Sequence, residues 1–250
     1  MVDHELKRPY LLLDAGGTLV SPNAEIIRQS AKSHGLSLDV DAVLDAFFRN
    51  IHGLDLSLRQ GGVAPPLHPF LGSLMAPAGT PPSLVPAVLT EAERLCRRQD
   101  GGSWIRTFWT YALPWTRPAL ERLRAAGYRM SVVSNSDGSV AHQVADLGLA
   151  RYLDVVFDSQ VLGVEKPDPR FFHLVLEQLG VGAADCLLVG DVFMIDVVGA
   201  NAVGVPAAHI DPLGLYAGWP GVHTRDLRTF AEALITGELD PLDPRLLAMR

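Results

Sequence analysis

The segment Tyr10–Val20, which reads YLLLDAGGTLV, limits the possible folds more than any other part of the chain. An apolar run ends at Asp14, and the glycine pair Gly16 and Gly17 follows almost at once. A short apolar run bounded by turn residues is typical of a buried strand. The pattern therefore predicts a strand that carries Asp14 to its carboxyl end, where open α/β sheets bind their ligands. An Asp that merely ends a strand and caps the next turn would give the same residues, so this segment alone does not decide a function.

Beyond Pro114, short apolar segments alternate with segments of helical spacing. Strands are expected at 128–136, 154–159, 186–191 and 206–210, and helices at 116–127, 139–148, 168–180, 196–204 and 227–235. Alternation of this kind predicts a parallel sheet with helices on both of its faces. The last residues, 237–250, contain two prolines and are predicted to form a loosely held tail.

Residues 21–112 have a different character. Helical spacing is found at 23–35, at 40–58 with an expected break at Gly53, and at 84–98, and no strand stands out among them. Prolines are dense from 65 to 86 and predict irregular loops there. The sequence thus predicts a doubly wound α/β core, residues 1–20 and 113–250, with a helical domain, residues 21–112, inserted after the first strand.

Composition excludes several classes of protein. The net charge of −7 disfavours a general nucleic-acid-binding surface, because phosphate backbones require a basic face. The N-terminal sequence MVDHELKRPY has no apolar signal-peptide region, and no apolar run approaches the roughly 20 residues of a membrane span. We expect a cytoplasmic monomer or homodimer that binds neither nucleic acid nor membrane.

Polar residues follow three further predicted strands. They are Ser134 and Asn135 after the second strand, Lys166 before a helix, and Asp191 and Asp196 around the end of the strand CLLVG. The carboxyl ends of parallel strands meet at one edge of a sheet, so we expect these groups to lie near Asp14. Three carboxylates would suit Mg²⁺, and Lys166 with the Ser134 hydroxyl would suit phosphate oxygens. Asp14 could then attack phosphorus and form an aspartyl-phosphate.

Four segments of the chain, DAGGTL, VVSNS, VLGVEKPDPRFF and VGDVFMIDVVGANAVGV, resemble in order the motifs of haloacid dehalogenase-superfamily hydrolases that carry a helical cap after the first motif. The resemblance implies a Mg²⁺-dependent hydrolase of a small phosphate ester. It assigns the roles of nucleophile to Asp14, phosphate binding to Ser134, Asn135 and Lys166, and metal binding to Asp14, the Gly16 carbonyl, Asp191 and Asp196. The resemblance also implies that Lys166 is a catalytic residue together with Asp14.

The chain departs from this family pattern at Gly16. Phosphatases of the family carry there a second Asp, which protonates the leaving group and then activates water. Glycine can do neither, and general acid–base help is typically worth a factor of about 10² to 10⁴. The favoured interpretation is a phosphohydrolase that is slow, uses a good leaving group, or takes an acid from the cap, where His52, Asp55 and His68 are candidates.

Two alternatives remain open at this stage. The chain could be a phosphate-binding or regulatory protein that has lost catalysis. It could also perform 2-haloacid dehalogenase or phosphonatase chemistry. Dehalogenases lack the second Asp but do not need Mg²⁺, whereas Asp191 and Asp196 suit a metal. A phosphonatase needs a cap lysine for a Schiff base, and Lys32 is the single lysine of residues 21–112, on what is expected to be a solvated helix face.

Overall fold

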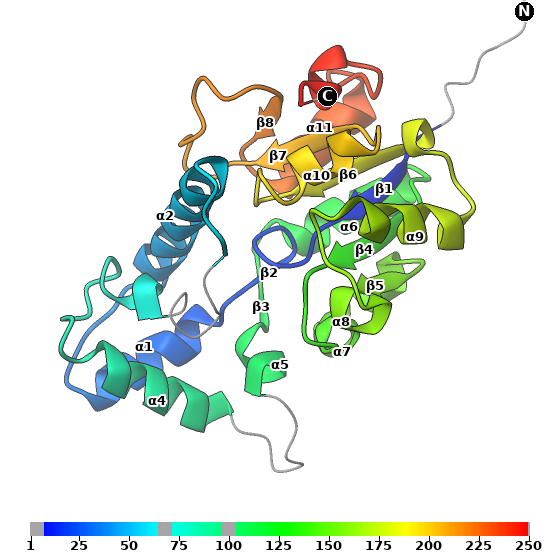
Figure 1. The fold of residues 1–250 in the computed structure, drawn as a ribbon. Helices are drawn as coiled ribbons and strands as arrows, with labels where there is room; N and C mark the ends of the chain where they lie inside the picture. Colours follow the sequence, from blue (N-terminus) through cyan, green and yellow to red (C-terminus); the bar gives the residue numbers. More distant parts are fainter. Residues whose placement is uncertain (1–7, 65–71, 97–103, 250) are drawn as a thin grey trace, which may run out of the picture.

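The computed structural model of the chain describes residues 8–64, 72–96 and 104–249. These residues form a parallel α/β core and a group of helices inserted behind its first strand (Figure 1). Among the helices described, none has both the length and the apolar character needed to cross a bilayer.

The core is one six-stranded parallel sheet with the order β5-β4-β1-β6-β7-β8. The strands are β1 (Tyr10–Leu13), β4 (Met130–Ser134), β5 (Val156–Asp158), β6 (Cys186–Gly190), β7 (Ala207–Ile210) and β8 (Val222–Thr224). The chain leaves β1 toward β4 on one side and later returns to β6 on the other, so the strand order reverses beside β1. Such a switch point opens a crevice at the carboxyl ends of the strands.

Helices cover both faces of the sheet, as the sequence predicts. Leu11 and Leu13 point to one face and pack with α6 (Thr116–Ala125), α7 (Val140–Asp146) and α11 (Leu227–Thr236). Tyr10 and Leu12 point to the other face and pack with α9 (Pro169–Leu179) and α10 (Val197–Ala202). The alternation follows from the two-residue period of a strand, and all four residues of β1 are buried because both faces are covered. The remaining short elements are α8 (Ser159–Leu162), η1 (Ala150–Tyr152) and η2 (Ala183–Asp185).

The inserted helices are α1 (Ala24–Ser33), α2 (Val40–Arg59), α4 (Val85–Cys96) and α5 (Trp104–Phe108). They share a hydrophobic cluster of their own, which includes Ile27, Phe47 and Leu89. A ribbon of two antiparallel strands, β2 (Val20–Ser21) and β3 (Tyr111–Ala112), joins this segment to the core. The chain therefore enters and leaves the inserted helices at one place.

Two sequence-based expectations for this segment were wrong. The ribbon strands at its ends were not predicted, because two residues are too few to give a recognisable pattern. The break expected at Gly53 is absent, and α2 runs through it as a helix of 20 residues. A helical glycine costs about 1 kcal/mol relative to alanine. Burial of Phe47, Phe48 and Ile51 on the same helix outweighs that cost.

The C-terminal tail was expected to be loosely held, and this was also wrong for the residues described. Leu239 and Leu246 are buried in the cluster beneath β1, and η3 (Pro244–Leu247) forms a short helical turn. The side chain of Asn201 donates to the carbonyl of Leu246 at 2.8 Å and accepts from the amide of Met249 at 3.1 Å. Strand β8 was likewise not predicted, and its three residues are only half-buried.

Candidate active site

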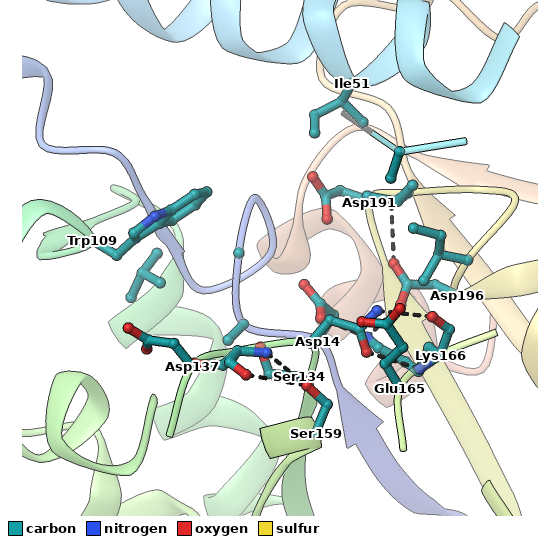
Figure 2. Close-up of a pocket in the computed structure, with 18 of the residues that line it drawn as sticks. Asp14, Ile51, Trp109, Ser134, Asp137, Ser159, Glu165, Lys166, Asp191 and Asp196 are labelled. Atoms are coloured by element: carbon teal, nitrogen blue, oxygen red, sulfur yellow. Dashed lines mark hydrogen bonds and ion pairs between the residues drawn. The ribbon is translucent and has the colours of Figure 1, made fainter. Parts of the chain in front are cut away.

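Five buried polar side chains meet at the carboxyl edge of the central strands (Figure 2). They are Asp14 after β1, Ser134 at the end of β4, Lys166 before α9, Asp191 after β6 and Asp196 before α10. Leu13 is in register with both Val132 and Val189, so the three central strands end side by side. The sequence predicted this grouping, and the structure brings all five residues to one pocket.

The ammonium group of Lys166 lies between two carboxylates. Its Nζ donates to Oδ1 of Asp14 and to Oδ1 of Asp196, at 2.6 Å in each case, and to the Val133 carbonyl at 2.8 Å. Burial lowers the pKa of Lys166, but the two carboxylates outweigh burial and leave that pKa above its usual value. Burial raises the pKa of Asp14 to about 7, while Lys166 opposes this change and Asp196 adds to it. Lys166 is thus a fixed, buried positive charge beside Asp14.

Lys166 donates to Asp14 and Asp196 but to neither oxygen of Asp191. Within the described part of the chain, neither of its buried carboxylate oxygens has a hydrogen-bond partner. Burial raises the pKa of Asp191 well above its usual value, and the charges of Asp14 and Asp196 add to this. One oxygen from each of these three carboxylates lies within 4.8 Å of the others. An all-oxygen set with an excess of negative charge fits a hard divalent cation such as Mg²⁺.

Glycines make room for these carboxylates. A Cβ on Gly17 would lie 1.8 Å from Oδ2 of Asp191, and Gly17 also has a φ of +75°. A Cβ on Gly190 would lie 2.4 Å from the carboxylate of Asp196. Both acidic side chains therefore reach the centre only because their neighbours in the fold have no side chain. This requirement explains the second glycine of the DAGGTL segment in physical terms.

Asn135 lies at the border of the pocket, and its side chain is bonded to the backbone of Lys166. Its Nδ2 donates to the carbonyl of Lys166 and its Oδ1 accepts from the Lys166 amide, at 2.8 Å each. The two bonds fix the loop from which the Lys166 side chain extends. Asn135 borders the pocket, but both polar atoms of its side chain are engaged in holding that loop.

Gly16 lies under an aromatic ring. A Cβ at this position would be 3.2 Å from Cζ3 of Trp109, which is tighter than most real Cβ contacts. Trp109 follows α5, and its segment is held beside the start of α1 because the Asn23 amide donates to the Phe108 carbonyl at 2.7 Å and Asn23 Nδ2 donates to Thr110 at 3.0 Å. A side chain at position 16 would therefore require the indole to shift by a few tenths of an ångström.

The candidate acids of the inserted helices do not face Asp14 as free groups. Oδ2 of the fully buried Asp55 accepts from the amide of Phe193 at 2.9 Å and from the Tyr216 hydroxyl at 2.5 Å, and its Oδ1 accepts from the amide of Met194 at 2.7 Å. His52 packs edge-on against the Tyr216 ring, with the ring centroids 4.8 Å apart, and is not part of the pocket lining.

The other two candidates from residues 21–112 gain no support. His68 lies outside the described residues. Lys32 is exposed on α1, away from the pocket lining, as expected for a solvated lysine.

Sequence reasoning missed the upper wall of the pocket. The cavity measures about 500 Å³, and the inserted helices with their ribbon contribute the apolar residues Val20, Phe47, Ile51, Leu54 and Trp109. Opposite them, exposed Asp137 and Glu165 stand on loops of the core. Nothing local in the sequence indicates that the ring of Trp109 covers Gly16.

Comparison with known proteins places the four motifs in a wider context. A family model described as haloacid dehalogenase-like hydrolase matches residues 10–204. Haloacid dehalogenase-like hydrolase domain-containing protein 3 of Mus musculus is 30% identical over 217 residues, which are 81% of this chain and 81% of that protein. The plasmid-encoded phosphoglycolate phosphatase of Cupriavidus necator is 32% identical over 155 residues, covering 54% of this chain and 66% of that enzyme.

Solved structures share the fold at lower sequence identity. The HAD-hydrolase YfnB of Bacillus subtilis, in a magnesium-bound crystal form, has a TM-score of 0.60 at 16% identity and covers 91% of this chain and 99% of its own. The L-2-haloacid dehalogenase of Xanthobacter autotrophicus has a TM-score of 0.55 at 18% identity and covers 91% of this chain and 98% of its own. At these identities the likeness concerns the fold, which hydrolases of different chemistry share.

Proposed function

Because the chain belongs to the haloacid dehalogenase-like hydrolase family, we propose that it is a Mg²⁺-dependent phosphohydrolase of a small phosphate ester. The observation that carries this proposal is the buried cluster in which Lys166 bonds Asp14 and Asp196, while the oxygens of Asp191 have no hydrogen-bond partner among the described residues. Relatives that are named phosphatases support it. In this proposal the inserted helices act as a cap over the pocket.

In the proposed reaction, Asp14 attacks the phosphorus atom of the ester. A bond forms between an Asp14 oxygen and phosphorus, and the bond from phosphorus to the ester oxygen breaks, with its electron pair going to the leaving oxygen. Lys166 holds Asp14 in place and offsets negative charge, and the Ser134 hydroxyl is available to donate to a phosphoryl oxygen. Asp14, Asp191 and Asp196, with the Gly16 carbonyl, would hold Mg²⁺, whose positive charge allows an anionic ester to approach these carboxylates.

Water completes the reaction by attacking the phosphorus of the aspartyl-phosphate. The bond from phosphorus to Asp14 breaks, the carboxylate is restored, and the proton of the water passes to phosphate or solvent. Gly16 offers no group that could take this proton. The second step is therefore expected to be slow relative to the first for any ester with a good leaving group.

Gly16 also supports a second candidate function. Without a proton acceptor at position 16, the chain could bind phosphate and Mg²⁺ without turnover and act as a regulatory protein. Dehalogenase chemistry gains no such support. The carboxylate of a 2-haloacid would need a cation, and Lys166, already bonded to two carboxylates, is the only cationic side chain in the described pocket lining.

Rapid-mixing kinetics with p-nitrophenyl phosphate test the proposal. In Mg²⁺ we expect a burst of nitrophenolate close to one per protein molecule, followed by slower turnover, and Asp14→Asn should abolish both phases. Mg²⁺ should also raise the melting temperature of the native protein but not of Asp191→Asn.

No nitrophenolate release with Mg²⁺, or release that survives Asp14→Asn, would overturn the phosphohydrolase. A Mg²⁺-dependent rise in melting temperature without turnover of any ester would favour the phosphate-binding candidate instead.

A further inference from the structure

We propose that the substrate is an aromatic phosphate monoester whose leaving group is acidic and whose body carries no second negative charge. This inference rests on the proposed phosphohydrolase and names its substrate class. Three features lead to it: an aromatic wall and, within the pocket lining that the structure describes, a glycine in place of an acid at position 16 and a single ammonium group.

The aromatic wall consists of Trp109 and Phe47, which both line the pocket, and Figure 2 shows Trp109 set apart from Asp14. Trp109 is half-buried, and the ring of Phe47 packs against it edge-on with the centroids 5.8 Å apart. Phe47 fixes the indole and leaves part of its surface open to the pocket. A flat aromatic body would bury apolar area on this surface and could stack on the indole.

The missing proton donor restricts the leaving group. Gly16 has no side chain, Trp109 covers it, and Asp55 is engaged by two amides and a hydroxyl. Exposed Asp137 and Glu165 also border the pocket, and the hydroxyl of Ser139 donates to Asp137. An alcohol must leave as an alkoxide with a basicity near that of hydroxide, whereas a phenolate, with a pKa of about 10 or less, leaves without protonation.

The shortage of cations excludes a second anionic group. The described lining holds one ammonium, that of Lys166, and its three donors go to Asp14, Asp196 and the Val133 carbonyl. The exposed carboxylates of Asp137 and Glu165 add negative charge to the same lining. A carboxylate or second phosphate on the substrate would meet like charge without a partner. The pocket therefore selects a monoester with a neutral body.

Steady-state kinetics in Mg²⁺ with matched pairs of esters test the inference. Phenyl phosphate is compared with cyclohexyl phosphate, which has a similar size but an alcohol leaving group. We expect kcat/KM to favour phenyl phosphate by at least about 10²-fold, and to rise further with more acidic phenols. 4-Carbamoylphenyl phosphate is compared with 4-carboxyphenyl phosphate, and the charged ester should be at least about tenfold poorer.

A substitution of Trp109 tests whether the aromatic wall causes the preference for aromatic esters. Trp109→Leu should raise KM for phenyl phosphate. It should also reduce the advantage in kcat/KM of phenyl phosphate over acetyl phosphate, an acyl phosphate with a good leaving group and no aromatic body, by about tenfold or more. Trp219→Leu serves as the matched control, because Trp219 lies on the loop before β8 and outside the pocket lining. The control should leave the ratio between the two substrates as it is in the native protein.

The possible results distinguish a wrong substrate class from a wrong phosphohydrolase proposal. Turnover of cyclohexyl phosphate or 2-phosphoglycolate with the same kcat/KM as phenyl phosphate would overturn the substrate class and leave the phosphohydrolase standing. An equal loss of the ratio in Trp109→Leu and Trp219→Leu would remove the role of the wall. No turnover of any ester, acetyl phosphate included, would instead overturn the proposed function.

Discussion

Position 16 is occupied by glycine although its backbone conformation is open to other amino acids. Gly16 does not have a positive φ, in contrast to Gly17, so its conformation does not demand glycine. The obstacle to a side chain is the ring of Trp109, 3.2 Å from the place of a Cβ. An acid at position 16 and an indole at position 109 thus compete for one space. We therefore expect a proton shuttle at position 16 to need a substitution of Trp109 as well.

This competition gives a prediction for a pair of substitutions. Gly16→Asp alone should change kcat/KM for cyclohexyl phosphate less than about tenfold, because the ring leaves the carboxyl no room to reach the leaving oxygen. Gly16→Asp combined with Trp109→Ala should raise kcat/KM by about 10² or more over Trp109→Ala, the typical worth of general acid–base help. Equal rates for the double variant and Trp109→Ala would contradict this explanation of Gly16.

The sequence predicted which polar residues gather at the sheet edge, because each of them directly follows or precedes a recognisable strand or helix. It could not predict the competition between Gly16 and Trp109, which lie 93 positions apart and meet only in the folded chain. Asn135 shows the same limit. Its position after β4 was foreseen, but its bonds to the backbone of Lys166 depend on how the loop before α9 folds. The catalytic and metal-binding roles remain predictions for the experiments described above.

Helix α2 of the insertion is hydrogen-bonded to the loop of the core that follows β6 and carries Asp191 and Asp196. Asp55 of α2 accepts from the amides of Phe193 and Met194, between Asp191 and Asp196 in the chain. Burial raises the pKa of Asp55 to about 6, although the hydroxyl of Tyr216 and the two amides favour its charged form. An acidic residue that the sequence offered as a proton donor therefore joins the insertion to the core.

Removing one acceptor from this junction should be costly. In Asp55→Asn an amide NH₂ would face a backbone amide donor, and a buried unsatisfied donor costs roughly 1–3 kcal/mol of unfolding free energy. Urea denaturation should show this loss, and hydrogen exchange of residues 192–196 should be faster than in the native protein. Asp45→Asn is the matched control, because Asp45 is an exposed carboxylate on the same helix and should change stability by no more than about 0.5 kcal/mol. Equal effects of the two substitutions would show that Asp55 does not fix the loop.

Across the whole molecule, buried titratable groups change the free energy of unfolding in opposite directions as pH changes. Burial lowers the pKa of His209 to about 3, while the carbonyl of Asp191, which its Nε2 contacts at 2.9 Å, acts in the opposite direction. An unfolded histidine has a pKa near 6.5. Between these values the unfolded chain binds the extra proton, so the contribution of His209 is present above pH 6.5 and is lost as pH falls toward 3. Asp14, whose pKa is raised to about 7, acts with the opposite sign and loses its contribution as pH rises.

Urea denaturation at several pH values tests the sign for His209. The native protein should lose more unfolding free energy than His209→Gln between pH 7 and pH 4, by about 2–3 kcal/mol. The glutamine retains an NH₂ donor for the Asp191 carbonyl but cannot take up a proton. Parallel stability curves for the two proteins would mean that the folded chain binds a proton at His209 as readily as the unfolded chain, and would contradict the lowered pKa.

The ribbon of β2 and β3 also bears on how the chain finds its fold. Leu11 pairs with Met130 across more than a hundred residues of sequence, a separation that normally makes strand pairing slow. Because Val20 lies opposite Ala112, the inserted helices bring their own two ends together once they have packed. The segment that connects β1 to β4 then acts as a short loop. The entropy cost of closing the long loop has already been met when the inserted helices pack. Early folding of the inserted helices thus turns the long-range pairing of β1 with β4 into a local one.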